Sequence, residues 1–495
     1  MSINFFDAVT ESYCSAADIE KDLNLKVIAR AMAEGEYGDV PDIMEILLRP
    51  LLTEDAIEKR LAVVMDSCKN REFILKIRKI LVETYHNLSN HMKAILDCRG
   101  RHLTEDTVIG TNLEALRTLV HGLTALHELL EEKKAVLENT ALNRFYREFY
   151  EEISPEKIAE QKFLADNLDS FKNKGEIFLQ GYLTEGFRMK HVEVVDVKER
   201  ARRVSAGIFS GKRNDVIAEE EIYESGVAFT NDILLDVLER SFPYLQRWQE
   251  LLLNMRKQAV FLAGCARLYK RGGELGLTFG VPDREEDKAD VVYELSLALQ
   301  TQSVPVPNSL TAPLYKAIIV TGANQGGKST FLRSMGIAQV MCQAGMYVPA
   351  EKYPLYAYRN IFTHFTRRED AAMNMGKFEE ELRRMQDILQ GTGENTLLLL
   401  NESFATTTEV TAYQIAMDLT HACMEEGVTL WMVTHITKFA RKLYEEKRED
   451  VLFLSAGRVA RQEKQYTMIA KEPEDTSYGM ELYERIIGGN EVENQ

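Results

Sequence analysis

Apolar residues recur at helical spacing through most of the first third of the chain. The segments 43–48 and 57–65 carry apolar side chains three and four positions apart, and the longest such stripe runs over 113–130. This spacing places the apolar side chains on one face of a helix, which a folded domain buries. We therefore predict helices from about residue 15 to 165, with nearly all of these positions in the core.

The pattern changes between about residues 175 and 225. Polar and apolar residues alternate over 191–194, as in a half-buried strand, and several glycines punctuate the segment. Helical spacing returns over about 229–270. A helical excursion that leaves, passes through a β-rich insert and returns is typical of a lever with a tip.

Beyond about residue 300, short and continuous apolar runs replace the helical stripes. The runs over 317–320, 396–400 and 429–433 each end at glycine or polar residues, which predicts buried parallel strands. The alternating valines and prolines at 304–307 mark the entry to this region. We predict a helical core and first lever (1–174), a β-rich basic insert (175–228), a returning lever helix and connection (229–300), and an α/β domain (301–495).

Composition narrows the class of protein. The 495 residues suffice for about three domains, and 45% hydrophobic with 28% charged residues is typical of a soluble globular protein. No apolar run approaches the roughly 20 residues that cross a bilayer, and the N-terminus lacks the basic start of a secretory signal. Six scattered cysteines form no CxxC pair, which disfavours a disulfide framework or a zinc site. We expect a cytoplasmic protein with no membrane partner.

The charge is distributed unevenly. The net charge of −17 disfavours a protein whose whole surface lies on DNA, because neutralising phosphates supplies most non-specific affinity. The segment 188–213 nevertheless holds eight basic residues against three acidic ones, a local charge of +5. The sequence leaves two interpretations open, a solvated charged face or a nucleic-acid contact. The candidate contacts are Lys198, Arg200, Arg202, Arg203, Lys212 and Arg213.

A glycine-rich loop carries the most specific chemistry in the chain. It follows the apolar run 317–320, precedes a helical pattern, and has the G-x-x-x-x-G-K-[ST] spacing of a phosphate-binding loop. Glycines let backbone N–H groups close around phosphates, and a helix N-terminus adds partial positive charge. We predict ATP binding with Mg²⁺. The predicted binding residues are Gly322, Asn324, Gly326, Gly327, Lys328, Ser329 and Thr330, with Lys328 reaching the β and γ phosphates and Ser329 ligating the metal.

Polar residues end two of the later strands. Asn401 and Glu402 follow the apolar run 396–400, at the place where nucleotide hydrolases carry an Asp for the Mg²⁺ shell and a Glu that orients the attacking water. We therefore assign Asn401 to the metal shell and Glu402 to catalysis. His435 follows the run 429–433, where it can hydrogen-bond the γ-phosphate or the water. Lone histidines are more often structural, but this position beside a phosphate-binding loop favours the catalytic role.

Together these motifs resemble the MutS-type DNA mismatch-repair ATPases, which are relatives of the ABC ATPases. The segment 321–330 resembles the TGPNMGGKST of that family, and 433–435 and 477–479 resemble its ATH switch and SYG element. The segment from Ile361 through Glu369, Phe378 and Glu381 reproduces the spacing of its IFTRxGxxDD…STFxxE region. The match is close from about 305 to 488 and weaker toward the N-terminus.

The resemblance implies an α-helical core and lever with a small β-rich insert, followed by an α/β P-loop domain of the ABC type. It also implies a homodimer, a DNA-gripping insert, and double-stranded or branched DNA as the partner. The chain departs from the family at three points. We expect it to lack the mismatch-reading and connector domains, Gly376 replaces a serine that reaches the γ-phosphate of the partner subunit in the family, and Asn401 replaces the metal-shell Asp.

The intact phosphate-binding loop predicts ATP binding, and these departures predict slow hydrolysis. The predicted function is a nucleotide-switched dimeric clamp on DNA that acts in mismatch repair or recombination. The alternative is an ATP-dependent dimerisation or scaffold protein whose partner is a protein. The net charge of −17 favours that alternative, and the basic insert favours the clamp.

Overall fold

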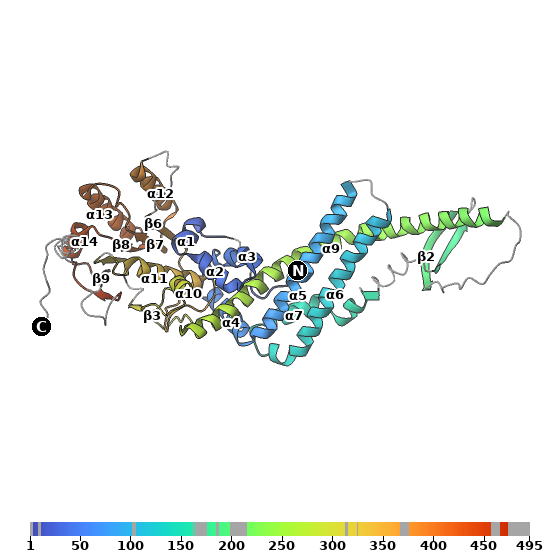
Figure 1. The fold of residues 1–495 in the computed structure, drawn as a ribbon, viewed down its shortest axis with the longest axis horizontal. Coiled ribbons are helices and arrows are strands. Elements are labelled where there is room, and N and C mark those ends of the chain that lie inside the picture. Colours follow the sequence, from blue (N-terminus) through green and yellow to red (C-terminus); the bar gives the residue numbers. More distant parts are fainter. Residues whose placement is uncertain are drawn as a thin grey trace. The chain divides into compact units, whose positions relative to one another are not determined.

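The computed structural model describes residues 3–7, 11–100, 105–160, 162–163, 176–184, 188–198, 215–311, 315–323, 325–366, 376–456 and 466–473. The chain forms two compact units (Figure 1), each built from two segments that are distant in sequence. The first unit combines Met1–Phe5 with Glu72–Ala259, and the second combines Phe6–Arg71 with Val260–Gln495.

The first unit consists mainly of long helices. These are α5 (Arg71–Gly100), α6 (Glu105–Leu137), α7 (Asn143–Glu152) and the first part of α9 (Asp215–Leu275). The N-terminal segment is fixed among them, because the ring of Phe5 stacks on Phe145 with centroids 3.8 Å apart and its N–H donates to Gln258 Oε1 at 2.7 Å. Helix α9 contains Pro243, which removes one backbone donor from the helix interior.

A β-hairpin lies in the part of the chain where sequence alternation predicts a β-rich insert. Strands β1 (Glu176–Thr184) and β2 (Arg188–Lys198) pair antiparallel, from Glu176 opposite Lys198 to Thr184 opposite Arg188, with two register shifts. Such irregularities increase the local twist of a two-stranded ribbon.

A six-stranded sheet organises the second unit. Its order is β10-β9-β5-β8-β7-β6, with β10 antiparallel to β9 and the other neighbours parallel. The strands are β5 (Ala317–Thr321), β6 (Asn360–Phe365), β7 (Thr396–Asn401), β8 (Val428–Val433), β9 (Val451–Ala456) and β10 (Met468–Ala470). The predicted α/β architecture is confirmed as a largely parallel sheet, and the continuous apolar runs are its interior strands, buried on both faces.

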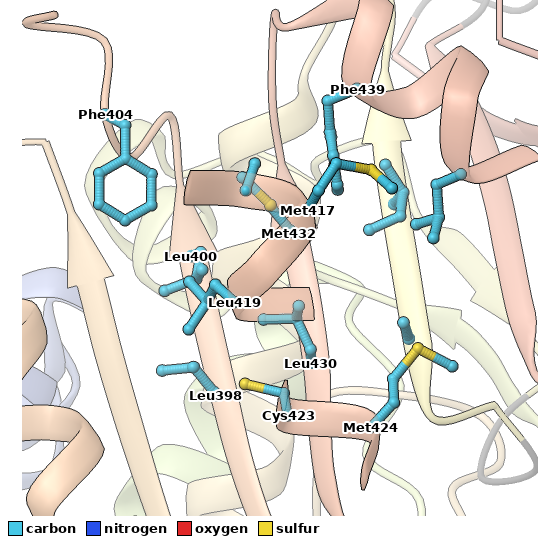
Figure 2. Close-up of a cluster of buried hydrophobic side chains, with 14 of the residues drawn as sticks. Leu398, Leu400, Phe404, Met417, Leu419, Cys423, Met424, Leu430, Met432 and Phe439 are labelled. Carbon is cyan, nitrogen blue, oxygen red and sulfur yellow. The ribbon is translucent and has the colours of Figure 1, made fainter. Parts of the chain in front are cut away.

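Helices cover both faces of this sheet. Leu398 and Leu400 of β7 point into a cluster closed by α13 (Glu409–Glu425) and α14 (Thr437–Glu445), which Figure 2 shows with Met417, Leu419 and Phe439. Alternate side chains point to the opposite face. There Leu399 lies against Gly336 of α11 (Lys328–Gln343), whose added Cβ would approach the leucine to 2.8 Å. The helices α13 and α11 accordingly lie on opposite sides of the sheet in Figure 1.

The early segment of the second unit packs on this domain. It contains α1 (Ala16–Asp22), α2 (Leu25–Ala33), the 3-10 helix η1 (Tyr37–Asp39), α3 (Val40–Leu47) and α4 (Glu54–Lys69). The carboxylate of Asp22 accepts the N–H of Phe365 at 3.3 Å, and the N–H of Leu51 donates to the carbonyl of Gln343 at 2.8 Å. These contacts attach residues near the N-terminus to the sheet and to α11.

The remaining elements of the second unit are the end of α9, the pair β3 (Ala289–Val292) and β4 (Asn308–Leu310), α10 (Leu295–Thr301), and α12 (Lys377–Gly391). Across the residues that the structure describes, no helix has both the length and the apolar character needed to cross a membrane.

Candidate functional site

A tight loop connects β5 to α11 and depends on its glycines. Gly322 and Gly327 have φ angles of 117° and 86°, in the left-handed region that favours glycine. An added Cβ at Gly322 would lie 2.8 Å from the backbone nitrogen of Ala456, and one at Gly326 would lie 2.7 Å from the Ala456 Cβ. The loop therefore follows a path that side chains would obstruct. Asn324, assigned to the same loop from sequence, lies outside the described residues.

Lys328 points back into this loop. Its side chain is buried, and its ammonium donates to the carbonyl oxygens of Gly322 at 2.9 Å and Ala323 at 3.0 Å. Burial lowers the pKa of Lys328, and the negative charge of Glu402 opposes that shift. A buried ammonium whose bonded partners are neutral carbonyls favours an added anion. Ser329 and Thr330 follow in the first turn of α11 and are half-buried.

The carboxyl ends of three parallel strands meet beside this loop. The N–H of Glu402 donates to the carbonyl of Val433 at 2.9 Å, which joins the ends of β7 and β8. The N–H of Thr434 donates to the carbonyl of Val320 at 3.0 Å, which joins β8 to β5. His435 comes next and is exposed. The structure thus places Lys328, Glu402 and Thr434, the residue before His435, at the carboxyl ends of the parallel strands.

Asn401 is the last residue of β7 and is half-buried. Its Oδ1 atom is buried and accepts no hydrogen bond from any described residue. A buried oxygen of this kind is suited to a water or a cation shell, which fits the metal-shell role assigned from sequence. Within the described residues, no three His, Cys, Asp or Glu side chains gather as a metal-binding cluster. The metal-binding role assigned from sequence to the Ser329 hydroxyl and the Asn401 amide stays a prediction.

The assigned DNA contacts are mostly beyond what the structure describes. Lys198 is the last residue of β2, and its side chain is not described. Arg200, Arg202, Arg203, Lys212 and Arg213 all lie outside the described residues, as do the residues of the SYG-like element at 477–479. The assignment of these basic side chains stays a prediction.

Several contacts at the tip of β7 were not expected from the sequence. The Thr366 hydroxyl donates to the carbonyls of Asn401 at 3.1 Å and Glu402 at 2.8 Å. The Ser403 hydroxyl lies 2.7 Å from His364 Nδ1, and the carboxylate of Glu381 accepts the Phe404 N–H at 2.5 Å. The spacing of Phe378 and Glu381 resembles the STFxxE region of the family, and this is the one sequence signal that singles out Glu381. The other residues carry no local pattern that separates them from ordinary polar positions.

Comparison with known protein families gives a match over the segment that contains the glycine loop and the ends of β7 and β8. Residues 318–492 match the family model described as MutS domain V. The chain is 27% identical over 255 residues to the DNA mismatch repair protein MutS of Thermus aquaticus, which covers 48% of this chain and 30% of the relative.

Two further relatives match over shorter segments. A DNA mismatch repair protein MutS from Thermotoga petrophila is 34% identical over 121 residues, 24% of this chain and 15% of the relative. The DNA mismatch repair protein MSH3 of Eremothecium gossypii is 34% identical over 105 residues, 21% of this chain and 10% of the relative. In each case the matched segment spans less than a third of the relative.

Proposed function

This chain is a MutS-family protein by its domain V, and from that premise we propose that it binds ATP and hydrolyses it slowly, as a nucleotide-switched dimeric clamp on DNA. The observation that carries the proposal is the buried ammonium of Lys328, which faces the glycine loop beside the charge of Glu402. That arrangement suits a phosphate chain better than a neutral ligand.

The residues of the loop divide the work of binding. Backbone N–H groups of the loop and the N-terminus of α11 would hold the phosphates, and the Lys328 ammonium would transfer its hydrogen bonds from the two carbonyls to phosphate oxygens. The Ser329 hydroxyl and Asn401 Oδ1 would hold Mg²⁺ directly or through its water shell. Bound Mg²⁺ neutralises charge that develops on the phosphates.

Hydrolysis would depend on Glu402 and His435. The Glu402 carboxylate would accept a proton from the attacking water and hold it in line, and His435 would hydrogen-bond the water or the γ-phosphate. Asn401 supplies a neutral oxygen where a carboxylate would strengthen the metal shell, so we propose that turnover is slow.

Nucleotide binding is tested by Lys328→Ala. The substitution removes the buried ammonium, so we expect ATP affinity to fall at least about tenfold, the equivalent of one charge-assisted hydrogen bond. Equilibrium titration with a fluorescent ATP analogue measures the change. Lys438→Ala is the matched control, because Lys438 is an exposed lysine of the same unit that pairs with Glu409. Equal affinity in wild type and Lys328→Ala would rule out this nucleotide site.

The DNA clamp is supported by the basic segment and by the relatives, whose names describe DNA mismatch repair proteins. We propose that the insert of residues 175–228 contacts the phosphates of double-stranded or branched DNA, and that two copies of the chain close around it. Replacing Arg200, Arg202 and Arg203 together by Ala should weaken binding and lower the slope of log K against log salt by about 0.9 for each phosphate that the variant no longer neutralises.

A charge-matched control separates a local contact from the general field. Replacing the exposed lysines Lys26, Lys69 and Lys79 by Ala removes the same charge outside the insert. A gel-shift titration in which both triple variants bind as tightly as wild type would remove the insert as the DNA contact.

The net charge of −17 favours a second candidate, an ATP-dependent dimerisation or scaffold protein that binds a protein. Absence of DNA binding at about 50 mM salt, where counterion release is most favourable, together with ATP-dependent dimerisation, would support this candidate over the clamp.

A further inference from the structure

The segment after β7 has an unusual backbone. Glu402 and Phe404 have φ angles of 54° and 67°, both in the left-handed region, although neither is glycine. Side chains other than glycine adopt this region rarely, and they remain in it where the surroundings hold them. The backbone of Glu402, the residue that would orient the attacking water, is therefore held by contacts outside β7.

Glu381 of α12 supplies two of these contacts. Its side chain is buried, one carboxylate oxygen accepts the Phe404 N–H at 2.5 Å, and the other accepts the Thr406 hydroxyl at 2.8 Å. Hydrogen bonds to a buried carboxylate are among the stronger ones in proteins, and both oxygens are used. Glu381 thus fixes the backbone two residues after Glu402.

Other contacts hold the segment from different sides. The ring of Phe404 is fully buried at one margin of the apolar cluster (Figure 2), and the Ser403 hydroxyl also donates to the His364 carbonyl at 3.2 Å. These contacts belong to the sheet and to the cluster beneath it. The contact from Glu381 differs, because it comes from the helix that begins directly after Gly376.

We propose that Glu381 is a positioning residue for ATP hydrolysis: through Phe404 and Thr406 it holds Glu402 in its left-handed conformation, and so makes the position of α12 decide whether that carboxylate is aligned. This inference rests on the proposed ATPase function. Glu381 needs no contact with the nucleotide. The N–H of Glu402 stays bonded to Val433 and its carbonyl to Thr366, so a shift of α12 would remove the restraint on the C-terminal side of Glu402 without altering the glycine loop or Lys328.

The substitution Glu381→Gln tests the proposal. Glutamine keeps one oxygen acceptor, but its NH₂ group cannot accept the second hydrogen bond. We expect kcat for ATP hydrolysis to fall at least about tenfold while the Kd for ATP stays within about twofold of wild type. Glu379→Gln is the control, because Glu379 is an exposed glutamate of the same helix that pairs with Arg383. A variant with unchanged kcat would overturn the proposal.

A double variant separates positioning from a loss of stability. If Glu381 acts through Glu402, adding Glu381→Gln to Glu402→Gln should change the residual rate by less than about twofold, because the group being positioned is already gone. Independent losses that multiply in the double variant would show that Glu381 acts by another route. Thermal unfolding of each variant reports any general destabilisation.

Amide hydrogen exchange gives a readout that needs no turnover. In wild type we expect slow exchange at Phe404, and in Glu381→Gln at least about tenfold faster exchange over 402–406 with unchanged exchange over 396–400. If wild type shows no ATPase activity, the proposed function fails, while this measurement still decides whether Glu381 holds the segment. Unchanged exchange at Phe404 would overturn the positioning role.

Discussion

At the scale of single residues, the end of β7 combines one acidic and one neutral side chain. Glu402 carries a charge that acts on Lys328, whereas the buried Asn401 Oδ1 has no hydrogen-bond partner among the described residues. Mg²⁺ binds charged oxygens more strongly than amide oxygens. Replacing Asn401 by a charged residue should therefore change the rate of ATP hydrolysis through the metal shell alone.

We predict that Asn401→Asp raises the rate of ATP hydrolysis about 10- to 100-fold, the range expected from one charge-assisted hydrogen bond gained in the transition state, about 1.5–3 kcal/mol. Steady-state ATPase assays with and without duplex, mismatched and four-way-junction DNA measure the change. A rate equal to that of wild type would show that Asn401 does not slow hydrolysis.

The glycine loop supports a second prediction. Gly326→Ala would place a Cβ 2.7 Å from the Ala456 Cβ and 3.0 Å from the Ala323 carbonyl, so the loop must shift. We expect ATP affinity to fall at least about tenfold, since backbone N–H groups would leave their places around the phosphates. Gly38→Ala is the control, because an added Cβ there has no neighbour within 4 Å. Tight ATP binding by Gly326→Ala would show that the loop tolerates the displacement.

Some residues of the candidate site could be predicted because their signals are local. The glycine motif that contains Lys328 and the apolar run before Glu402 are each a short continuous segment of the sequence. The first predicts a phosphate-binding loop, and the second predicts a buried strand that ends in polar residues. The pair His364–Ser403 has no such signal, because its members meet only after β6 and β7 become neighbours. The spacing of Glu381 resembles that of the family, but its contact with Phe404, 23 positions away, has no local signal.

At the scale of elements, α1 is tied to the end of β6. The Asp22 carboxylate accepts the Phe365 N–H, and the Asp22 backbone carbonyl accepts a hydrogen bond from Arg333 at 2.9 Å. The positive charge of Arg384 acts to lower the pKa of Asp22. Burial nevertheless raises the pKa of Asp22, which means that the folded protein resists ionising this side chain.

This raised pKa predicts a pH dependence for Asp22→Asn. The contribution of Asp22 to the free energy of unfolding is fully present below its unfolded pKa of about 3.8 and is lost as the pH rises through its higher folded pKa. Asparagine keeps an acceptor oxygen and cannot ionise, so the variant should gain stability relative to wild type as the pH rises above about 4. Urea denaturation at pH 4 to 7 measures this difference. A difference that stays constant over this range would contradict the assignment.

The same contact shows why the fold could be predicted only in part. Periodicity predicts that the helices near the N-terminus bury one face, but it does not say which distant segment covers that face. In the structure the segment Phe6–Arg71 packs with Val260–Gln495 in one unit. The division into four successive regions stays a prediction about domains.

At the scale of the whole molecule, the proposed dimer would complete each nucleotide site with residues of two subunits. Gly376 occupies the position at which the family resemblance implies a serine that reaches the nucleotide of the partner subunit. It is exposed, it has an ordinary φ of −64°, and an added Cβ has no neighbour within 4 Å. A serine can therefore replace it without strain.

We predict that Gly376→Ser raises ATP turnover about tenfold, as expected for one added hydrogen bond to a charged group in the transition state. Mixing shows whether the hydroxyl acts on the other subunit. The double variant Gly376→Ser/Lys328→Ala cannot use its own site, yet it should stimulate wild-type protein when the two are combined. No stimulation on mixing, with sedimentation showing a monomer, would contradict the composite site.

The split composition of the second unit has a consequence for synthesis on the ribosome. Asp22 cannot form its hydrogen bond to Phe365 until the ribosome has added 343 more residues. At 5–20 residues per second, that synthesis takes roughly 20–70 s. Through that interval Leu23, which is fully buried beside Gly336 of α11 in the finished fold, lacks this cover. The nascent chain therefore exposes apolar surface for a time that is sufficient for chaperones to bind. The speed of translation thereby affects the yield of folded protein.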